Sequence, residues 1–222
     1  MKGILRVHRS KRQARRAYDR LSRFYDYFAA IFEGKSRDVA LGRLGIAEGE
    51  KVLEIGFGTG HCLVRIAEAV GVKGRAYGID LSPGMIEAAR RRLQKKGLQR
   101  GPWLCCGDAE TLPFKDRILD AVFMSFVLEL FDTHEIPRVL REVRRVLKPG
   151  GRLGVVSMSK DGGGLALRLY EWAHKKFPVY VDCRPIYVAQ AIEEAGFGIR
   201  YREKITLLGL PGEIVVAEAP AR

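Results

Sequence analysis

A glycine-rich turn behind a short apolar strand is the part of this sequence best suited to bind a ligand. The strand covers residues 51–55, and the turn that follows contains Gly56, Gly58 and Gly60. Glycine lets the backbone turn tightly and lets a ligand approach the main chain closely. In open α/β sheets ligands bind beyond the carboxyl ends of the strands, where this turn lies. We therefore predict a ligand site at residues 56–60.

Two acidic residues narrow the choice of ligand. Glu54 lies just before the glycines and would repel a pyrophosphate, whereas it would attract the ammonium group of S-adenosylmethionine. Asp80 lies near the end of the next predicted strand, at the spacing of an acid that binds ribose hydroxyls. His61 occupies the position where dinucleotide-binding turns carry a small third residue. The pattern favours S-adenosylmethionine over a dinucleotide, and so disfavours a dehydrogenase.

Four segments in order resemble the motifs of class I S-adenosylmethionine-dependent methyltransferases. They are residues 54–60, 78–85, 107–114 and 141–151. Within that class the chain is similar to the ubiquinone/menaquinone biosynthesis C-methyltransferases, which share Tyr18-Asp19 and Phe24-Tyr25-Asp26 upstream of the first motif. It differs from them at residues 125–130, Ser-Phe-Val-Leu-Glu-Leu, where the quinone enzymes usually carry an asparagine.

The resemblance implies roles for individual residues around the cofactor. The glycines would face its methionine part, with Glu54 near the amino group and Asp80 on the ribose. Met85 could equally be a core methionine. The remaining implied contacts are Leu81 and Met85 beside the adenine, Asp108 and the Ala109 N–H on its polar edge, Ser125 and Phe126 near the transferred methyl group, and Tyr18 closing over the cofactor.

A general base and a metal site are harder to find in the sequence. A phenol or an acidic ring carbon needs a base, for which Glu129, His134, His174 and Tyr180 are candidates, none preferred. The four cysteines are Cys62, Cys105, Cys106 and Cys183, and they lack the spacing of a zinc site. We expect no bound metal.

Strand and helix patterns alternate along the chain, which is typical of βαβ units. We predict an α/β fold: a Rossmann-like, seven-stranded, mostly parallel sheet with helices on both faces and an antiparallel C-terminal hairpin. The predicted strands are residues 51–55, 76–81, 103–106, 120–125, 152–157, 199–208 and 213–219. The predicted helices include one ending near Gly34 and others at residues 35–44, 60–70, 83–96, 135–147, 165–176 and 185–195, with Ser82 as an N-cap.

The whole chain, residues 1–222, is expected to form a single methyltransferase domain. Residues 1–46 would be an N-terminal helical cap, 47–159 the cofactor-binding core, 160–184 a lid and 185–222 a C-terminal helix and hairpin. The lid is rich in apolar and aromatic residues, including Tyr170, Trp172 and Phe177. It therefore indicates a small or lipid-like acceptor, such as a quinone precursor or a phospholipid.

The formal net charge of +13 gives information about possible binding partners rather than about the fold. Basic residues crowd the first 23 positions and could bring the protein to an anionic membrane surface. The same arm interleaves arginines with aromatics, so an RNA methyltransferase or a non-catalytic RNA-binding relative stays open as an alternative. With no secretory or membrane-spanning pattern, we expect a cytoplasmic protein, either free or peripheral at the membrane, as a monomer or homodimer.

Overall fold

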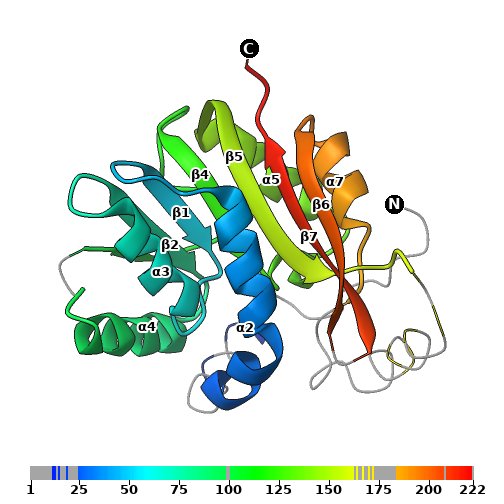
Figure 1. Cartoon of the computed structure of the whole chain (residues 1–222), viewed down its shortest axis with the longest axis horizontal. Coiled ribbons are helices and arrows are strands. Elements are labelled where there is room, and N and C mark those ends of the chain that lie inside the picture. The colour runs from blue at the N-terminus through cyan, green and yellow to red at the C-terminus, as the bar shows by residue number, and fades with distance from the viewer. Residues whose placement is uncertain are drawn as a thin grey trace.

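The computed structural model describes residues 12, 13, 15, 19, 25–98, 101–162, 164, 167, 170, 172, 184–207 and 209–221, with the backbone alone described for 25–33. Its centre is a seven-stranded sheet of order β3-β2-β1-β4-β5-β7-β6 (Figure 1). The first five strands pair in parallel, and β7 runs antiparallel to both β5 and β6. The predicted fold class is confirmed. The strands are β1 Lys51–Ile55, β2 Arg75–Asp80, β3 Trp103–Cys106, β4 Leu119–Ser125, β5 Leu147–Met158, β6 Gly198–Leu207 and β7 Leu210–Glu218.

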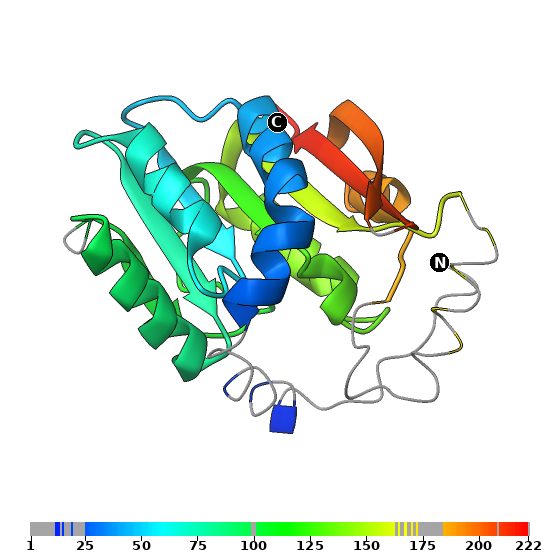
Figure 2. The same cartoon turned by 60° about the horizontal axis from the view of Figure 1, so that its bottom comes forward.

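Helices cover both faces of the sheet, as the alternating pattern requires (Figures 1 and 2). One hydrophobic core lies between the sheet and α2, α3 and α4, and a second lies between the sheet and α5 and α7. A 3₁₀ turn, η1, follows β4 and was not predicted. The bounds are α2 Tyr25–Leu44, α3 His61–Val70, α4 Pro83–Lys95, η1 Leu128–Leu130, α5 Ile136–Val146 and α7 Val188–Glu194.

The start of α4 follows its local sequence. Ser82 caps the helix, because its Oγ accepts a hydrogen bond of 3.1 Å from the Met85 N–H, and Pro83 occupies the first turn. Gly97, just after the helix, has φ +72°, a left-handed conformation that glycine adopts without steric cost. Both signals were predicted and are confirmed.

The predicted helix boundary at Gly34 is wrong. A single helix, α2, continues through this residue from Tyr25 to Leu44. A glycine inside a helix costs only about 1 kcal/mol. Burial of Ala40, Leu41 and Leu44 against the sheet offsets that cost, so tertiary packing overrides the local signal.

Strand pairing also overrides the predicted stop at residues 148–151. β5 begins at Leu147, which pairs with Leu119 of β4, and its register then shifts before Arg152. The N–H of Gly150 donates to the carbonyl of Ala219, so the C-terminal end of the chain holds this stretch extended. The sequence pattern at residues 148–151 could not reveal a partner so distant in the chain.

Two C-terminal boundaries differ from prediction in the same way. β7 begins at Leu210, so residues 208 and 209 alone connect it to β6, and the predicted loop at 209–212 is too long. Helix α7 begins at Val188 rather than at residue 185, because Ile186 forms a parallel bridge with Ser159. Of the predicted lid, only a few positions are described, and its helix at 165–176 lies largely outside the described residues. Among the described helices, none is long and apolar enough to cross a membrane.

Candidate functional site

The three glycines of the turn after β1 are all left-handed, but they have different surroundings. A Cβ atom on Gly56 (φ +66°) would lie 2.1 Å from a methyl carbon of Val127. On Gly60 (φ +82°) it would lie 2.9 Å from the Ala89 Cβ. On Gly58 (φ +52°) it would meet no atom within 4 Å. The outer glycines are therefore needed for packing, whereas the middle one presents open backbone that a ligand can approach.

Asp80, at the end of β2, joins this turn to the start of α4. Its carboxylate accepts hydrogen bonds of 2.9 Å from the N–H of Gly58 and 2.9 Å from the N–H of Ser82. Burial raises the pKa of Asp80 to about 6, although these backbone donors oppose the rise, and nearby Asp19 adds to it. The Asp80 carboxylate thus connects the turn after β1 to the loop after β2.

Asp19 brings the N-terminal segment to the same place. Its carboxylate accepts hydrogen bonds of 2.6 Å from the Ser82 hydroxyl and 3.1 Å from the Gly84 N–H. The negative charge of an acid at this position is also stabilised by the positive, N-terminal end of the α4 helix dipole. Tyr18, the neighbour predicted to close over the cofactor, lies outside the described residues.

Glu54, in β1, is a buried acidic residue directly before the glycine turn. Its side chain is only 2% exposed, and its Oε2 has no hydrogen-bond partner within the described structure. Burial raises the pKa of Glu54 to about 8; the charge of Arg37 opposes that rise and the charge of Asp80 adds to it. A buried carboxyl oxygen without a donor is costly. The site is therefore suited to a ligand that brings a cation or N–H donors.

The end of β4 lies beside the turn. Ser125 is 7% exposed and accepts a hydrogen bond of 3.1 Å from Arg37 Nε. The next residue, Phe126, has φ +55°, a left-handed backbone conformation that residues other than glycine rarely adopt. Its ring lies 5.9 Å from the guanidinium carbon of Arg37. Strain of this kind gathers at functional sites.

The predicted adenine-binding residues lie on the loops after β2 and β3. The Asp108 carboxylate accepts a hydrogen bond of 3.0 Å from the Glu110 N–H, which makes it a turn former in this structure. Ala109 is 5% exposed, and Cys106 contacts the Leu81 carbonyl through its sulfur at 3.6 Å. Met85 is 2% exposed, so its two interpretations, core residue and adenine contact, both remain predictions.

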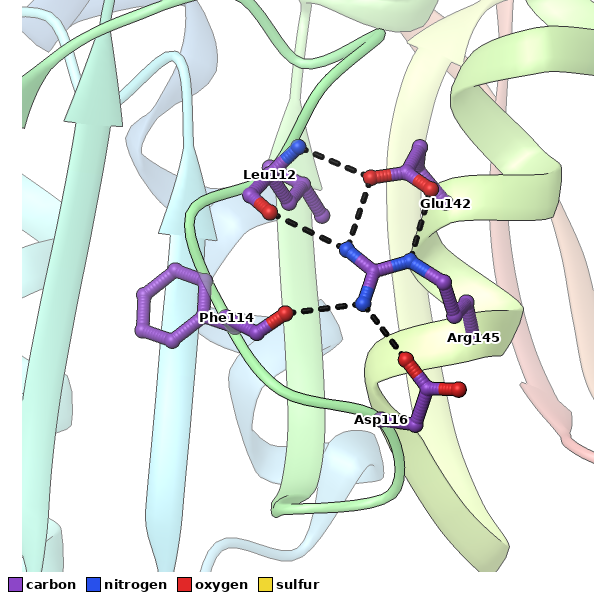
Figure 3. Close-up of polar contacts among 5 residues, drawn as sticks. All are labelled: Leu112, Phe114, Asp116, Glu142 and Arg145. Atoms are coloured by element: carbon purple, nitrogen blue, oxygen red, sulfur yellow. Dashed lines mark hydrogen bonds and ion pairs between the residues drawn. The ribbon is translucent and has the colours of Figure 1, made fainter.

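Arg145 on α5 fixes the loop at residues 112–116 that follows these residues (Figure 3). Its guanidinium donates to the carbonyls of Leu112 at 3.0 Å and Phe114 at 2.7 Å, and to the Asp116 carboxylate at 2.7 Å. Glu142 binds Arg145 at 2.7 and 2.8 Å and accepts from the Leu112 N–H at 2.8 Å. The sequence motif at residues 141–151 was predicted, but the roles of Glu142 and Arg145 in holding this loop were not. Their spacing of three residues on a helix, which brings their side chains together, was the one signal of their pairing.

Replacing Arg145 with leucine is expected to lower the free energy of unfolding by about 2–3 kcal/mol, since two partly buried carbonyls and Glu142 lose a charged donor. Chemical denaturation measures the change. Arg138→Leu is the matched control, because Arg138 lies on the same helix and makes an exposed ion pair with Glu110. Its effect is expected to stay within about 0.5 kcal/mol. Equal effects of the two substitutions would contradict the role of Arg145.

The candidate bases lie in different settings. Glu129 in η1 is fully buried, and its carboxylate accepts a hydrogen bond of 3.2 Å from the Met158 N–H at the end of β5. The His134 side chain is half exposed, with Nδ1 3.1 Å from an Asp132 carboxyl oxygen. His174 and Tyr180 lie outside the described residues. Within the described residues, no group of three or more His, Cys, Asp or Glu side chains could hold a metal ion.

The sequence comparisons point to one class of enzyme. Residues 52–151 match the family model described as a methyltransferase domain. The chain is 39% identical over 127 residues to the ubiquinone/menaquinone biosynthesis C-methyltransferase UbiE of Ectopseudomonas mendocina (strain ymp), covering 57% of this chain and 49% of that protein. It is 31% identical over 150 residues to the demethylmenaquinone methyltransferase of Geobacillus kaustophilus (strain HTA426), covering 65% and 63%. The chain thus spans about half to just under two thirds of these relatives.

Solved structures share the fold. A SAM-dependent methyltransferase from Aquifex aeolicus has a TM-score of 0.65 at 23% identity, covering 90% of this chain and 98% of that one. Geranyl diphosphate C-methyltransferase from Streptomyces coelicolor A3(2) has a TM-score of 0.70 at 15% identity, covering 84% and 79%. The [4+2]-cyclase SpnF has a TM-score of 0.75 at 20% identity, covering 96% and 98%. At such identities the likeness concerns the fold alone.

Fold and motifs together indicate one class: residues 52–151 match a methyltransferase domain, and the chain resembles the class I, S-adenosylmethionine-dependent methyltransferases in its motifs and its sheet. Within that class, the chain resembles the UbiE and demethylmenaquinone methyltransferases. The resemblance predicted from the sequence motifs is confirmed.

Proposed function

We propose that this protein transfers the methyl group of S-adenosylmethionine to an apolar small molecule, with a carbon of a quinone-type ring as the first acceptor to test. The observation that carries the proposal is the group formed by Glu54, Gly58 and Asp80. A buried carboxyl oxygen without a donor, an open left-handed glycine and a second carboxylate lie together at the carboxyl ends of β1 and β2. These residues fit a cofactor that combines an ammonium group with ribose hydroxyls.

In this proposal each part of the site has one task. Glu54 binds the amino group of the cofactor, Asp80 accepts from the ribose hydroxyls, and the backbone at Gly58 leaves room for the ligand. Leu81, Met85, Asp108 and Ala109 line the adenine, Ser125 lies near the methyl group, and Tyr18 covers the cofactor. The cofactor supplies an electrophilic methyl group. The protein contributes orientation and exclusion of water, which can account for much of the rate.

The proposed acceptor class comes from the relatives and from the composition of the chain. The relatives are named for methylation in ubiquinone and menaquinone synthesis. Residues 160–184 carry the apolar and aromatic side chains that a lipid-like acceptor would need. The basic N-terminal arm would bring the protein to the anionic membrane surface where such molecules reside. Neither of the two relatives named above is named as an RNA methyltransferase.

A general base would be needed if the acceptor is a quinol, because ionising a hydroxyl makes the ring carbon nucleophilic. Of the two candidates that the structure describes, Glu129 has the more suitable surroundings, since it is buried just after β4 and bonded to the end of the neighbouring strand β5. The His134 side chain, by contrast, is half exposed. Glu129 also braces the backbone of β5, so a test must separate the two roles by measuring stability alongside turnover.

The proposed activity is tested by transfer of a labelled methyl group from S-adenosylmethionine to demethylmenaquinol and ubiquinol precursors presented in detergent. We expect turnover of at least one quinol and none with a folded Gly58→Val variant. Binding of S-adenosylhomocysteine without transfer to any quinol would contradict the proposed acceptor and leave the cofactor assignment standing. Transfer of the labelled methyl group to RNA, and to no quinol, would show that the acceptor is a nucleic acid and overturn the proposed apolar acceptor.

Cofactor affinity is expected to rise with pH between about 6 and 7.5. The raised pKa of Glu54, about 8, means that this group is protonated at pH 6–7 in the free protein. An ammonium group favours the ionised form, so binding releases a proton and is favoured as pH rises. Calorimetry in buffers of different ionisation enthalpy is expected to show release of up to about one proton at pH 7. Glu54→Gln should abolish this release; unchanged release in that variant would contradict the assignment.

A further inference from the structure

Helix α4 exposes basic side chains that no acid of the described structure balances. One side of the helix is apolar and packs on the core, and the exposed positions lie on the other side. Arg90, Lys95 and Lys96 are exposed, and none of the three makes an ion pair with a described acid. Glu87 is the one acid of the helix, and it pairs with Arg91 at 3.2 Å. The outward face of α4 therefore carries a net positive charge.

The N-terminal segment adds positive charge beside this helix. Asp19 accepts hydrogen bonds from the Ser82 hydroxyl and the Gly84 N–H, so the chain before it is attached to the first turn of α4. Arg12 and Arg15 of that segment are exposed. The four-residue step from Arg15 to Asp19 spans at most about 14 Å. Helix α4 also begins at the edge of the sheet where α2 begins (Figure 1). The basic segment and the basic helix are thus neighbours.

The charges on other helices are arranged differently. Arg65 of α3 pairs with Asp38 of α2. The exposed charges of α7 are the acids Glu193 and Glu194. Helix α5 has exposed arginines, but it packs on the opposite face of the sheet from α4. The unbalanced positive charge attached to Asp19 therefore comes from α4 and the N-terminal segment.

A bilayer containing anionic lipids complements this surface. Its head groups present many negative charges in one plane, and they attract Lys and Arg side chains without needing a pocket. Each basic side chain near such a surface raises the affinity about 5-fold. Proteins that bind single-stranded nucleic acid usually combine basic residues with aromatic rings on which bases stack. Helix α4 has no aromatic residue, so its outward face suits lipid head groups better.

We propose that the outward face of α4, together with Arg12 and Arg15, docks the protein on an anionic lipid bilayer. The choice of a bilayer also rests on the proposed function, because an apolar acceptor resides in lipid. Ser82, which caps α4, donates its N–H to Asp80 at 2.9 Å. Docking through α4 therefore brings the candidate site near the lipid surface, and an apolar acceptor has a short path to it.

The test is sedimentation of the full chain with vesicles of phosphatidylcholine and phosphatidylglycerol. The salt concentration is about 0.1 M, where the Debye length is about 10 Å. The double variant Arg90→Gln, Lys95→Gln is expected to bind about 10- to 25-fold more weakly than wild type. The double variant Arg12→Gln, Arg15→Gln should lose a similar factor, about 5- to 25-fold. Vesicles of phosphatidylcholine alone should bind none of these proteins.

A third double variant controls for overall charge. Arg141→Gln, Lys204→Gln also removes two exposed charges, one from α5 and one from the edge strand β6. The strand β6 is at the far end of the sheet from β3, and α5 is on the opposite face from α4. Because salt screens distant charges, this variant should bind within about 3-fold of wild type. Thermal unfolding checks that every variant is folded.

The outcomes separate this inference from the proposed function. Weaker binding of the α4 and N-terminal variants, with the control near wild type, supports the docking surface. Equal weakening in the control would show that overall charge is responsible and would overturn it. A folded wild type that sediments with no anionic vesicle would also overturn it, whether or not it binds a short RNA. Vesicle binding needs neither cofactor nor acceptor, so it is measured independently of methyl transfer in detergent.

Discussion

Replacing Gly56 with alanine is expected to lower the free energy of unfolding by about 2–5 kcal/mol. The new Cβ would lie 2.1 Å from a methyl carbon of Val127, and the residue must keep φ +66°. Overpacking and left-handed strain therefore act together at a position where β1 and β4 end side by side. Because whole domains are stable by only about 5–15 kcal/mol, the loss should be plain in urea denaturation.

Gly58→Ala is the matched control, since it imposes a left-handed alanine in the same turn without a steric clash. It should cost only about 1–2 kcal/mol. The double substitution Gly56→Ala with Val127→Ala should recover much of the packing cost and leave the strain. Equal destabilisation by Gly56→Ala and Gly58→Ala would show that contact with Val127 does not limit this position.

Replacing Asp80 with asparagine is expected to reduce affinity for S-adenosylhomocysteine by about 100-fold, because the ribose hydroxyls lose a charged acceptor. Stability at pH 7 should change by less than about 1 kcal/mol, since two effects oppose each other. One backbone N–H, of Gly58 or Ser82, loses its acceptor, which costs about 1–3 kcal/mol. Removing a partly buried charge gains a similar amount.

The sign of that gain follows from the pKa. The pKa of Asp80 is raised to about 6 in the folded protein, so ionisation destabilises the fold as pH rises from about 4 to 6. Asparagine does not ionise and avoids this loss. Asp80→Ala leaves both backbone donors without an acceptor and should be less stable than Asp80→Asn. Unchanged affinity in a folded Asp80→Asn protein, measured by calorimetry, would contradict the ribose assignment.

Local chemistry made much of the fold predictable. The short apolar strand before the glycines, the Ser82-Pro83 cap and the stop at Gly97 are decided within a few residues, and each lies where it was expected. The alternation of strands and helices then leaves few topologies, because parallel crossovers are right-handed. Glu54 and Asp80 could be placed near strand ends because the strands that contain them were themselves predicted from local sequence.

The failures share a different cause. Gly34 lies inside a helix, and residues 148–151 lie inside a strand, because distant segments pack or pair with them. Arg37 was missed since nothing in its local sequence marks it, and only the crossing of α2 over the sheet brings it to Ser125. Long-range contacts of this kind leave no local pattern.

Calorimetric titration of the wild-type chain with S-adenosylhomocysteine at pH 7.5 tests the central claim most directly. The account predicts one site of about micromolar affinity, lost in a folded Gly58→Val variant whose side chain fills the open space above the turn. A well-folded wild type that shows no binding would contradict the claim that this turn and its two acids form a cofactor site.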